Sequence, residues 1–367
     1  MTWPEARARF PVLDRYAYLN AGSFGPLSRA SLEAMAAVRT WEGANGRAGR
    51  SYHEDRVARG ERVRALLADE IGVPVDNLAL TESTTRGVHV VVIGLDLGPG
   101  DEVVTTDAEH FGLSGPLAAS GASLRIAKVR DAPVADVFEL ILEQVTPRTR
   151  LIATSAVSWI DGKVLPWHAL RDVTQVPILI DGAQSVGALE VAATGADFYT
   201  VSGQKWLCGP DATGGLYVAD PDTLRPRLVA PPGAEEYDIA AGTWEPKAGA
   251  RRFDTAFLPV TSLAGLETAL VDVPPARFER ARLLTERCRG LLADQGYDVV
   301  TEADQATLVS FRFPGDTGAA VLELSRRGVI IRDLPGTDLL RASVGWWNDG
   351  SDLERLVEGL ASLSADM

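Results

Sequence analysis

The chain has 367 residues, of which 46% are hydrophobic and 23% charged, and its formal net charge is −14. This length exceeds what one compact core usually holds, so two domains are expected. The negative charge argues against nucleic acid as a partner, because phosphate contacts need a basic surface. The longest apolar stretch, residues 88–97, is too short to span a membrane, and the N-terminus lacks the apolar segment of a signal peptide, so we expect a cytoplasmic protein.

The metal-ligating and disulfide-forming residues are few. Two cysteines, Cys208 and Cys288, cannot build a disulfide framework and have no CxxC spacing. The four histidines are scattered without the spacing of metal ligands. No metal site is therefore expected.

Hydrophobic periodicity gives the expected elements in chain order. Helical periodicity marks residues 28–41 and 54–70. The expected strands that follow are residues 78–81, 102–105, 123–129, 151–155, 177–180, 198–201 and 215–218. Helical segments lie between several of them, at residues 85–95, 112–119 and 167–173. This alternation predicts an α/β fold with a mostly parallel central sheet and helices on both faces.

The pattern changes in the last third of the chain. Residues 224–250 are rich in Pro, Gly and Glu, and they predict a long irregular excursion of the kind that is often functional or interfacial. A long helical region then runs from 261 to about 292. Strands near 308–313, 329–332 and 340–343 and a final helix complete the chain, which predicts a smaller α+β domain.

Two charged residues come directly after buried strands. Asp181 ends the apolar run 176–180, and Lys205 follows the strand-like run 196–201 in a polar, glycine-containing turn. At the carboxyl ends of parallel strands, both can face one cleft. A lysine amine forms a Schiff base with an aldehyde and an aspartate holds a pyridinium N–H, so the pair suits pyridoxal phosphate. A surface lysine and an aspartate that caps a turn are the alternatives.

A third segment suits a phosphate group. The expected strand 78–81 runs into a hydroxyl-rich turn with Ser83, Thr84 and Thr85 at the start of a helix. Free N–H groups and the helix dipole favour an anion there. The alternative is that Ser83 or Thr84 only caps its own helix.

The order of these motifs resembles the class V aminotransferase family. The motifs are Asp181 with Gln184 and then Ser202, Gln204 and Lys205, followed by Gly-Pro at 209–210. That family has the type I pyridoxal-phosphate fold and includes cysteine desulfurases, cysteine or cystine C–S lyases and isopenicillin N epimerase-like enzymes. The resemblance runs from about residue 18 to about residue 360.

The resemblance implies a domain division and an assembly. A large cofactor-binding domain would span residues 18–258, and a small α+β domain would combine residues 1–17 with residues 259–367. The active site would lie between the domains at the interface of a homodimer. Thr255 lies in the segment where relatives reach a phosphate across that interface.

The resemblance also implies the roles of the cofactor-binding residues. His110 follows the strand 102–105 and would stack on the pyridine ring, although a generic loop histidine is the alternative. Gln184 would approach the ring oxygen, and Ser202 and Gln204 would add phosphate donors. Lys205, Asp181 and His110 are thus the expected catalytic residues.

Two arginines are candidates for binding a substrate carboxylate. Arg341 lies on the expected strand 340–343 and matches the family's carboxylate-binding arginine, whose planar fork pairs with a carboxylate through two bonds. Arg332 is a weaker candidate for the same role, and a solvent-exposed arginine at a strand edge is the alternative. Lys205 would then remove the substrate Cα proton.

Departures from the family pattern favour one reaction. Desulfurases carry a nucleophilic cysteine on the loop before the arginine, whereas residues 329–341 contain none. Gln204 stands where desulfurases usually have histidine, and it fits lyase- and epimerase-like relatives better. We therefore expect a C–S lyase that converts cysteine- or cystine-like amino acids to pyruvate, ammonia and a sulfur product. An aminotransferase or epimerase of the same family, or a catalytically silent relative that acts as a binding module, are the alternatives.

Overall fold

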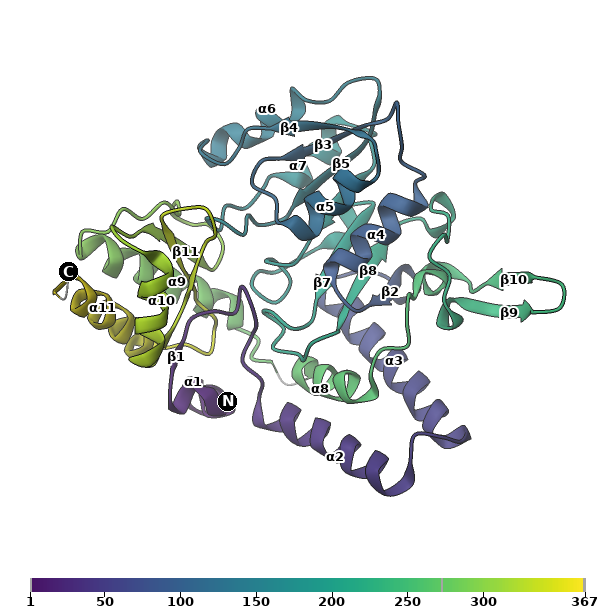
Figure 1. The fold of residues 1–367 in the computed structure, drawn as a ribbon, viewed down its shortest axis with the longest axis horizontal. Helices are drawn as coiled ribbons and strands as arrows, with labels where there is room; N and C mark the ends of the chain where they lie inside the picture. The colour runs from purple at the N-terminus through teal and green to yellow at the C-terminus, as the bar shows by residue number, and fades with distance from the viewer. Residues whose placement is uncertain (1, 272, 366–367) are drawn as a thin grey trace.

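A seven-stranded sheet forms the centre of the computed structural model, which describes residues 2–271 and 273–365 (Figure 1). The strand order is β2-β8-β7-β6-β5-β3-β4. Neighbours from β7 to β4 run parallel, whereas β8 runs antiparallel to β2 and β7. The bounds are β2 Leu78–Thr81, β3 Glu102–Thr106, β4 Ser123–Ala127, β5 Thr149–Ser155, β6 Ile178–Asp181, β7 Phe198–Ser202 and β8 Gly214–Val218.

The central strands β6 and β7 are buried throughout, and because successive side chains of a strand point to opposite faces, both faces of the sheet are covered there. In β6, Ile178 and Ile180 belong to one core cluster, whereas Leu179 between them belongs to another. The first cluster includes residues of α3 (Arg50–Glu70), α6 (Val137–Leu142) and α7 (Trp167–Val173). The second includes residues of α4 (Thr84–Gly94) and α5 (Phe111–Ala119). The predicted α/β architecture is confirmed.

A smaller lobe holds most of the C-terminal residues, at the left of Figure 1. Its antiparallel sheet has the order β11-β14-β13. The bounds are β11 Leu308–Arg312, β13 Arg332–Asp333, β14 Leu339–Ser343, α9 Arg277–Asp294, α10 Thr317–Arg326 and α11 Gly350–Ala365. Its core contains Leu292, Leu324 and Leu356, one residue from each of these three helices.

The N-terminal residues contact this small lobe. Strand β1 (Ala17–Tyr18) pairs in parallel with β12 (Val329–Ile330). From α1 (Trp3–Arg7), the Arg7 Nη1 donates to Asp352 Oδ2 at 2.6 Å. The domain boundary at residue 258 stays a prediction. Helix α8 (Val260–Val271), which the resemblance assigns to the small domain, packs against α2 (Arg29–Asn45) and α3 of the large domain.

One expectation about the later chain is wrong, and a second acquires an internal break. The segment 224–250 contains an antiparallel hairpin, β9 (Ala234–Asp238) with β10 (Thr243–Pro246), which projects at the right of Figure 1. Its residues are mostly exposed, so its sequence lacks the alternation of a half-buried strand. The helical region from 261 to 292 is two helices, α8 and α9, because the proline pair at 274–275 cannot continue a helix.

One further observation concerns membranes. Within the described residues, no helix combines the length and the apolar character needed to cross a bilayer.

Candidate functional site

The site is centred on the carboxyl edge of the parallel strands. Ser155, Asp181 and Thr200 are register partners in one row across β5, β6 and β7. Asp181 is 3% exposed, and its Oδ1 accepts hydrogen bonds from Ala183 N at 2.9 Å and Thr200 Oγ1 at 3.2 Å. These bonds fix the orientation of the carboxylate at the edge of the sheet. A buried, oriented carboxylate is what a protonated ring nitrogen requires.

Lys205 lies near this carboxylate in the turn after β7. Burial lowers the pKa of its half-buried amine to about 8, and Asp181 acts in the opposite direction. The positive charges of Arg341 and Arg332 lower the pKa further. The structure therefore brings together the lysine, the aspartate and both arginines that the sequence singled out. An amine with a pKa of about 8 is partly neutral near pH 7, which favours nucleophilic attack.

The predicted phosphate turn begins helix α4. Ser83 is the N-cap, and its Oγ accepts from Arg86 N at 3.2 Å. The first N–H groups of a helix have no partner within it, so those of Thr84 and Thr85 are suited to an anion. A side chain placed at Gly112 would come within 2.6 Å of Thr85 Oγ1, so the turn contacts the start of α5.

Thr255 reaches the same turn from within its own chain. Its Oγ1 donates to Glu82 Oε2 at 2.8 Å, and Glu82 directly precedes Ser83 in the sequence. The expected role of Thr255 at a partner subunit's phosphate therefore stays a prediction.

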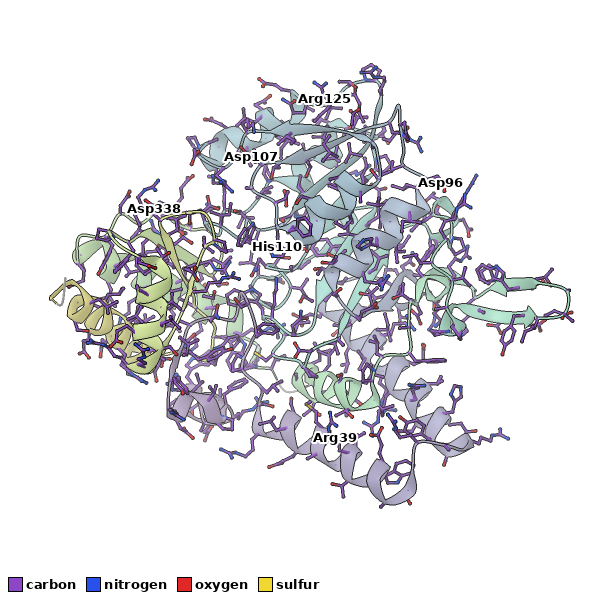
Figure 2. The ribbon with its side chains drawn as sticks, in the orientation of Figure 1. Arg39, Asp96, Asp107, His110, Arg125 and Asp338 are labelled. Atoms are coloured by element: carbon purple, nitrogen blue, oxygen red, sulfur yellow. The ribbon has the colours of Figure 1, made fainter. Side chains whose placement is uncertain are left out.

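His110 is the N-cap of α5, and it lies near the middle of the molecule, between the two lobes (Figure 2). Its Nδ1 accepts from Gly112 N at 3.0 Å, so a neutral ring carries its proton on Nε2. Partial burial lowers the pKa of His110, and the charge of Lys205 lowers it further. The ring stands edge-on to Trp159, with centroids 5.2 Å apart and an interplanar angle of 88°.

The amide side chains near Lys205 already have protein partners. Gln184 Nε2 donates to Gly22 O at 2.9 Å, and Gln184 Oε1 accepts from Trp206 Nε1 at 2.9 Å. One Nε2 hydrogen of Gln184 remains for a further acceptor. Ser202 Oγ donates to Gln204 Oε1 at 2.9 Å. The predicted cofactor contacts of these residues stay predictions.

Arg341 on β14 is a fully buried cation with unsatisfied donors. Its side chain is 0% exposed, and its Nη1 donates to Trp159 O. Its Nε and Nη2 have no hydrogen-bond partner in the part of the chain that the structure describes. Burial lowers the pKa of Arg341, as does the nearby Arg332, whose Nη1 donates to Ser23 Oγ at 3.3 Å. Two adjacent, unpaired N–H groups form the fork that binds a carboxylate.

The loop at residues 20–25 belongs to the site, and sequence reasoning missed it. Gly25 N donates to Gln204 O at 2.8 Å. A side chain at Gly25 would lie 2.0 Å from Lys205 O, and one at Gly22 would lie 2.7 Å from Arg341 Nη2. Only glycine lets this loop approach both segments so closely. The two glycines three positions apart were a signal, although not a specific one.

Trp159 was also missed as a site residue. Its ring contacts His110, its carbonyl oxygen accepts from Arg341, and the Arg332 guanidinium carbon lies 6.0 Å from its ring centroid. Its Nε1 is buried and has no partner among the described residues. Trp159 thus joins the histidine expected at the cofactor ring to the two arginines.

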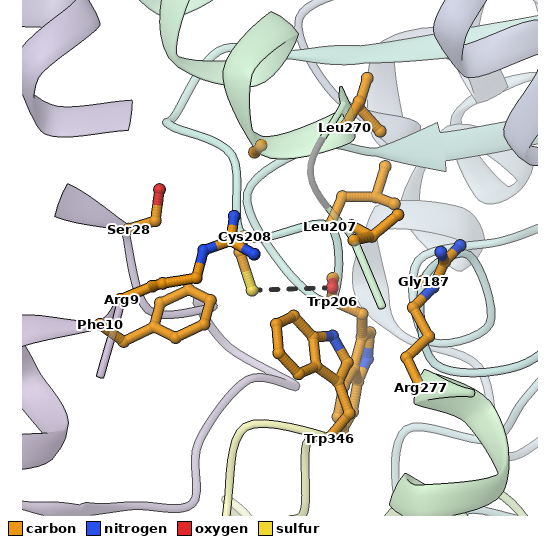
Figure 3. Close-up of a pocket in the computed structure, with 12 residues that line it drawn as sticks. Arg9, Phe10, Ser28, Gly187, Trp206, Leu207, Cys208, Leu270, Arg277 and Trp346 are labelled. Atoms are coloured by element: carbon orange, nitrogen blue, oxygen red, sulfur yellow. Dashed lines mark hydrogen bonds between the residues drawn. The ribbon is translucent and has the colours of Figure 1, made fainter. Parts of the chain in front are cut away.

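Neither cysteine is available as a nucleophile. Cys208 is 5% exposed and its Sγ contacts Trp206 O at 3.8 Å, in a small pocket lined by Phe10 and Trp346 (Figure 3). Burial raises the pKa of the Cys208 thiol, and it raises the pKa of Cys288 in helix α9 to about 12. Both thiols are therefore protonated and shielded.

Comparison with known proteins agrees with this geometry. Residues 18–356 match the family described as Aminotransferase class-V. The isopenicillin N epimerase of Streptomyces clavuligerus is 27% identical over 99% of this chain and 99% of its own length. A probable cysteine desulfurase of Pseudomonas aeruginosa is 29% identical over 95% of each chain.

A solved structure shares the whole fold. The cystine C–S lyase C-DES, in complex with its reaction product cysteine persulfide, superimposes with a TM-score of 0.87 and is 27% identical. The match covers 96% of this chain and 99% of C-DES. Another C-DES structure holds glycine covalently linked to its pyridoxal-phosphate cofactor.

The chain belongs to the class V aminotransferase family, and its fold is the type I pyridoxal-phosphate fold. It is an enzyme of that family, and family and neighbours indicate pyridoxal phosphate as its cofactor. The residues present suit this group. Lys205 supplies an amine of lowered pKa, Asp181 a buried carboxylate, and the start of α4 an anion site.

Proposed function

We propose that this enzyme is a pyridoxal-phosphate-dependent C–S lyase that acts on cysteine- or cystine-like amino acids by α,β-elimination. The observation that supports the proposal is a site with a lysine amine, a buried carboxylate and an arginine with two unpaired donors, but no reachable thiol. Both cysteines of the chain are buried, and the segment from residue 329 to 341 contains none. Sulfur cannot then be passed to a protein thiolate, so it leaves as a small molecule.

Each residue has a defined task in this proposal. Lys205 holds the cofactor covalently, Asp181 pairs with its ring nitrogen, and the first turn of α4 binds its phosphate. When bound, the cofactor supplies an electron sink for negative charge at the substrate Cα. His110 would cover one face of the ring, and the partial burial that lowers its pKa favours the neutral imidazole.

The substrate is oriented by its carboxylate. Arg341 Nε and Nη2 bind the two carboxylate oxygens, and this pairing removes the cost of two buried, unpaired donors. Arg332 adds positive charge beside them. The amine of Lys205 would be released when the amino group of the substrate displaces it from the cofactor. With the carboxylate fixed, this free amine would take the Cα proton as general base. The Cβ–S bond then breaks, the sulfur leaves with the bonding electrons, and hydrolysis yields pyruvate and ammonia.

Incubation with cystine tests this proposal. We expect pyruvate and ammonia in equal amounts, dependent on added pyridoxal phosphate and abolished in Lys205→Ala. A persulfide should appear in solution and not on the protein. Absence of pyruvate from both cysteine and cystine, in protein that binds the cofactor, would contradict the lyase assignment.

Epimerisation is the second candidate, because the isopenicillin N epimerase relative matches over 99% of this chain. Both reactions begin with removal of the Cα proton, so Lys205, Asp181 and Arg341 serve either. In deuterated water, an epimerase incorporates deuterium at Cα without forming pyruvate. Transamination, the third reaction open to the same residues, would instead accumulate pyridoxamine phosphate.

We also propose that the enzyme is a homodimer through the face that carries α2 and α3. A groove of about 460 Å³ between these helices is lined by Ala37, Trp41 and Tyr52 among others. Trp41 is 44% exposed and Phe257 37% exposed, and Phe257 lies two residues after Thr255, which contacts the phosphate turn. A second copy on this face would cover the turn. Sedimentation of the wild type and of Trp41→Glu tests this, and a wild-type monomer would contradict it.

A further inference from the structure

The half-buried acidic residue before His110, Glu109, has no part in the function proposed so far. Glu109 accepts three hydrogen bonds, so both of its oxygens are occupied. Its Oε1 accepts from Thr106 Oγ1 at 2.7 Å, and its Oε2 accepts from Ser155 N at 3.0 Å and from Ser155 Oγ at 2.5 Å. Glu109 therefore ties the loop after β3 to the last residue of β5.

This attachment point is next to Asp181. Ser155 is the register partner of Asp181 in the sheet, and Ala156 N donates to Asp181 O at 3.0 Å. Burial raises the pKa of Glu109 to about 7, and the charge of Asp181 raises it in the same direction. The two carboxylates are thus electrostatically coupled across neighbouring strands.

The loop that Glu109 attaches to β5 leads directly to His110. The loop at 107–109 connects β3 to α5, and Asp107 Oδ1 anchors its start by accepting from Val129 N at 2.8 Å and Arg130 N at 3.0 Å. Glu109 anchors its end, one residue before the imidazole that caps α5. Without the hydrogen bonds of Glu109, the backbone before His110 would lose its attachment to β5, whereas the hydrogen bonds of Asp107 would remain.

We propose that Glu109 is a positioning residue that holds His110 against the cofactor ring by tying the loop before α5 to the end of β5. This inference rests on the proposed cofactor site at Lys205 and Asp181. The three hydrogen bonds are compatible with glutamine, whose Oε1 can accept both bonds from Ser155 while its Nε2 donates to Thr106 Oγ1. Alanine can make none of them.

Cofactor binding by four variants tests the inference. We expect Glu109→Ala to weaken pyridoxal phosphate binding by about tenfold and to shift the visible absorbance of the bound cofactor. Glu109→Gln should restore affinity and absorbance to wild-type values. His110→Ala should weaken binding, and the double variant Glu109→Ala/His110→Ala should bind no worse than His110→Ala alone, because Glu109 acts through the histidine.

Glu102, the first residue of β3, offers a matched control, because it lies at the end of that strand away from Glu109. It is 4% exposed, and its Oε2 accepts from Thr146 Oγ1 at 2.6 Å. Glu102→Ala should leave cofactor affinity and absorbance unchanged. A wild-type protein that binds no cofactor would refute the proposed site itself. If the wild type binds the cofactor, any of three results would overturn the role of Glu109. These are wild-type cofactor affinity in Glu109→Ala, no recovery of affinity in Glu109→Gln, or additive losses of affinity in the double alanine variant.

Discussion

Substitution of Arg341 by methionine separates a binding role from a structural one. The guanidinium is fully buried, and two of its three nitrogens have no partner among the described residues. Each unpaired buried donor costs about 1–3 kcal/mol, whereas the one charge-assisted bond to Trp159 O contributes about 1.5–3 kcal/mol. Arg341→Met should therefore leave the free energy of unfolding of the cofactor-free protein unchanged or raise it by about 1–2 kcal/mol.

The same substitution should have the opposite effect on substrate binding. Two charge-assisted bonds to a carboxylate contribute about 1.5–3 kcal/mol each. Their loss corresponds to roughly a thousandfold rise in the KM for cystine. An amine substrate analogue without a carboxylate should bind the variant as well as it binds the wild type.

Arg64 provides the control, because it is a buried arginine with a full set of partners. It is 2% exposed, and it bonds Asp254 through Nη2–Oδ2 at 2.7 Å and Nη1–Oδ1 at 3.1 Å, and Leu78 O at 2.7 Å. Arg64→Met leaves Asp254 buried without its cation and should lower the free energy of unfolding by about 3–5 kcal/mol. Urea unfolding of both variants measures this contrast. Equal destabilisation, with cystine affinity retained in Arg341→Met, would refute the reasoning.

Three other predictions follow from the same structure. Because the pKa of Lys205, about 8, lies below the ordinary lysine value of 10.5, the unfolded chain binds more protons between these pH values, and the stability of the cofactor-free protein rises with pH across that window. Lys205→Met should thus be more stable than wild type at pH 7 by up to about 3 kcal/mol, and urea unfolding at pH 11 should find no such gain. Replacement of Cys208 and Cys288 together by alanine should leave pyruvate formation within about twofold of wild type after correction for folded protein, since neither buried thiol takes part; loss of turnover in folded protein would contradict this. Trp159→Phe replaces the indole by a smaller aromatic ring and removes the unpaired Nε1–H, which we expect to donate to the substrate. Stability should be unchanged while the KM for cystine rises about tenfold; an unchanged KM would exclude that contact.

The sequence predicted the parts of the site that depend on strand ends. Asp181 and Lys205 each follow a short apolar run, and parallel strands bring their carboxyl ends to one edge. Arg341 was proposed because it lies on an expected strand and matches the carboxylate-binding arginine of the family that the sequence resembles. The central strands were predictable because a strand that is buried on both faces requires a continuous apolar run.

The contributions made by tertiary contact could not be predicted in this way. Glu109, Trp159 and the loop at 20–25 meet the site only after segments far apart in sequence have packed together, as in the contact of Gly22 O with Gln184. The hairpin β9–β10 is mostly exposed, so no burial imposes a pattern on its residues. For Glu109, Trp159 and the loop at 20–25, the determining contacts are absent from any local window of sequence.

Chemical reduction followed by peptide mapping tests the central claim most directly. The chain has only four lysines, at positions 128, 163, 205 and 247, so the attachment point is easily distinguished. Lys163 is buried and donates to the carbonyl oxygens of Val129 and Ala132, which makes it a useful internal control. After borohydride treatment of the holoenzyme, we expect the phosphopyridoxyl group on Lys205 alone. A group on another lysine, or on none, would contradict the account.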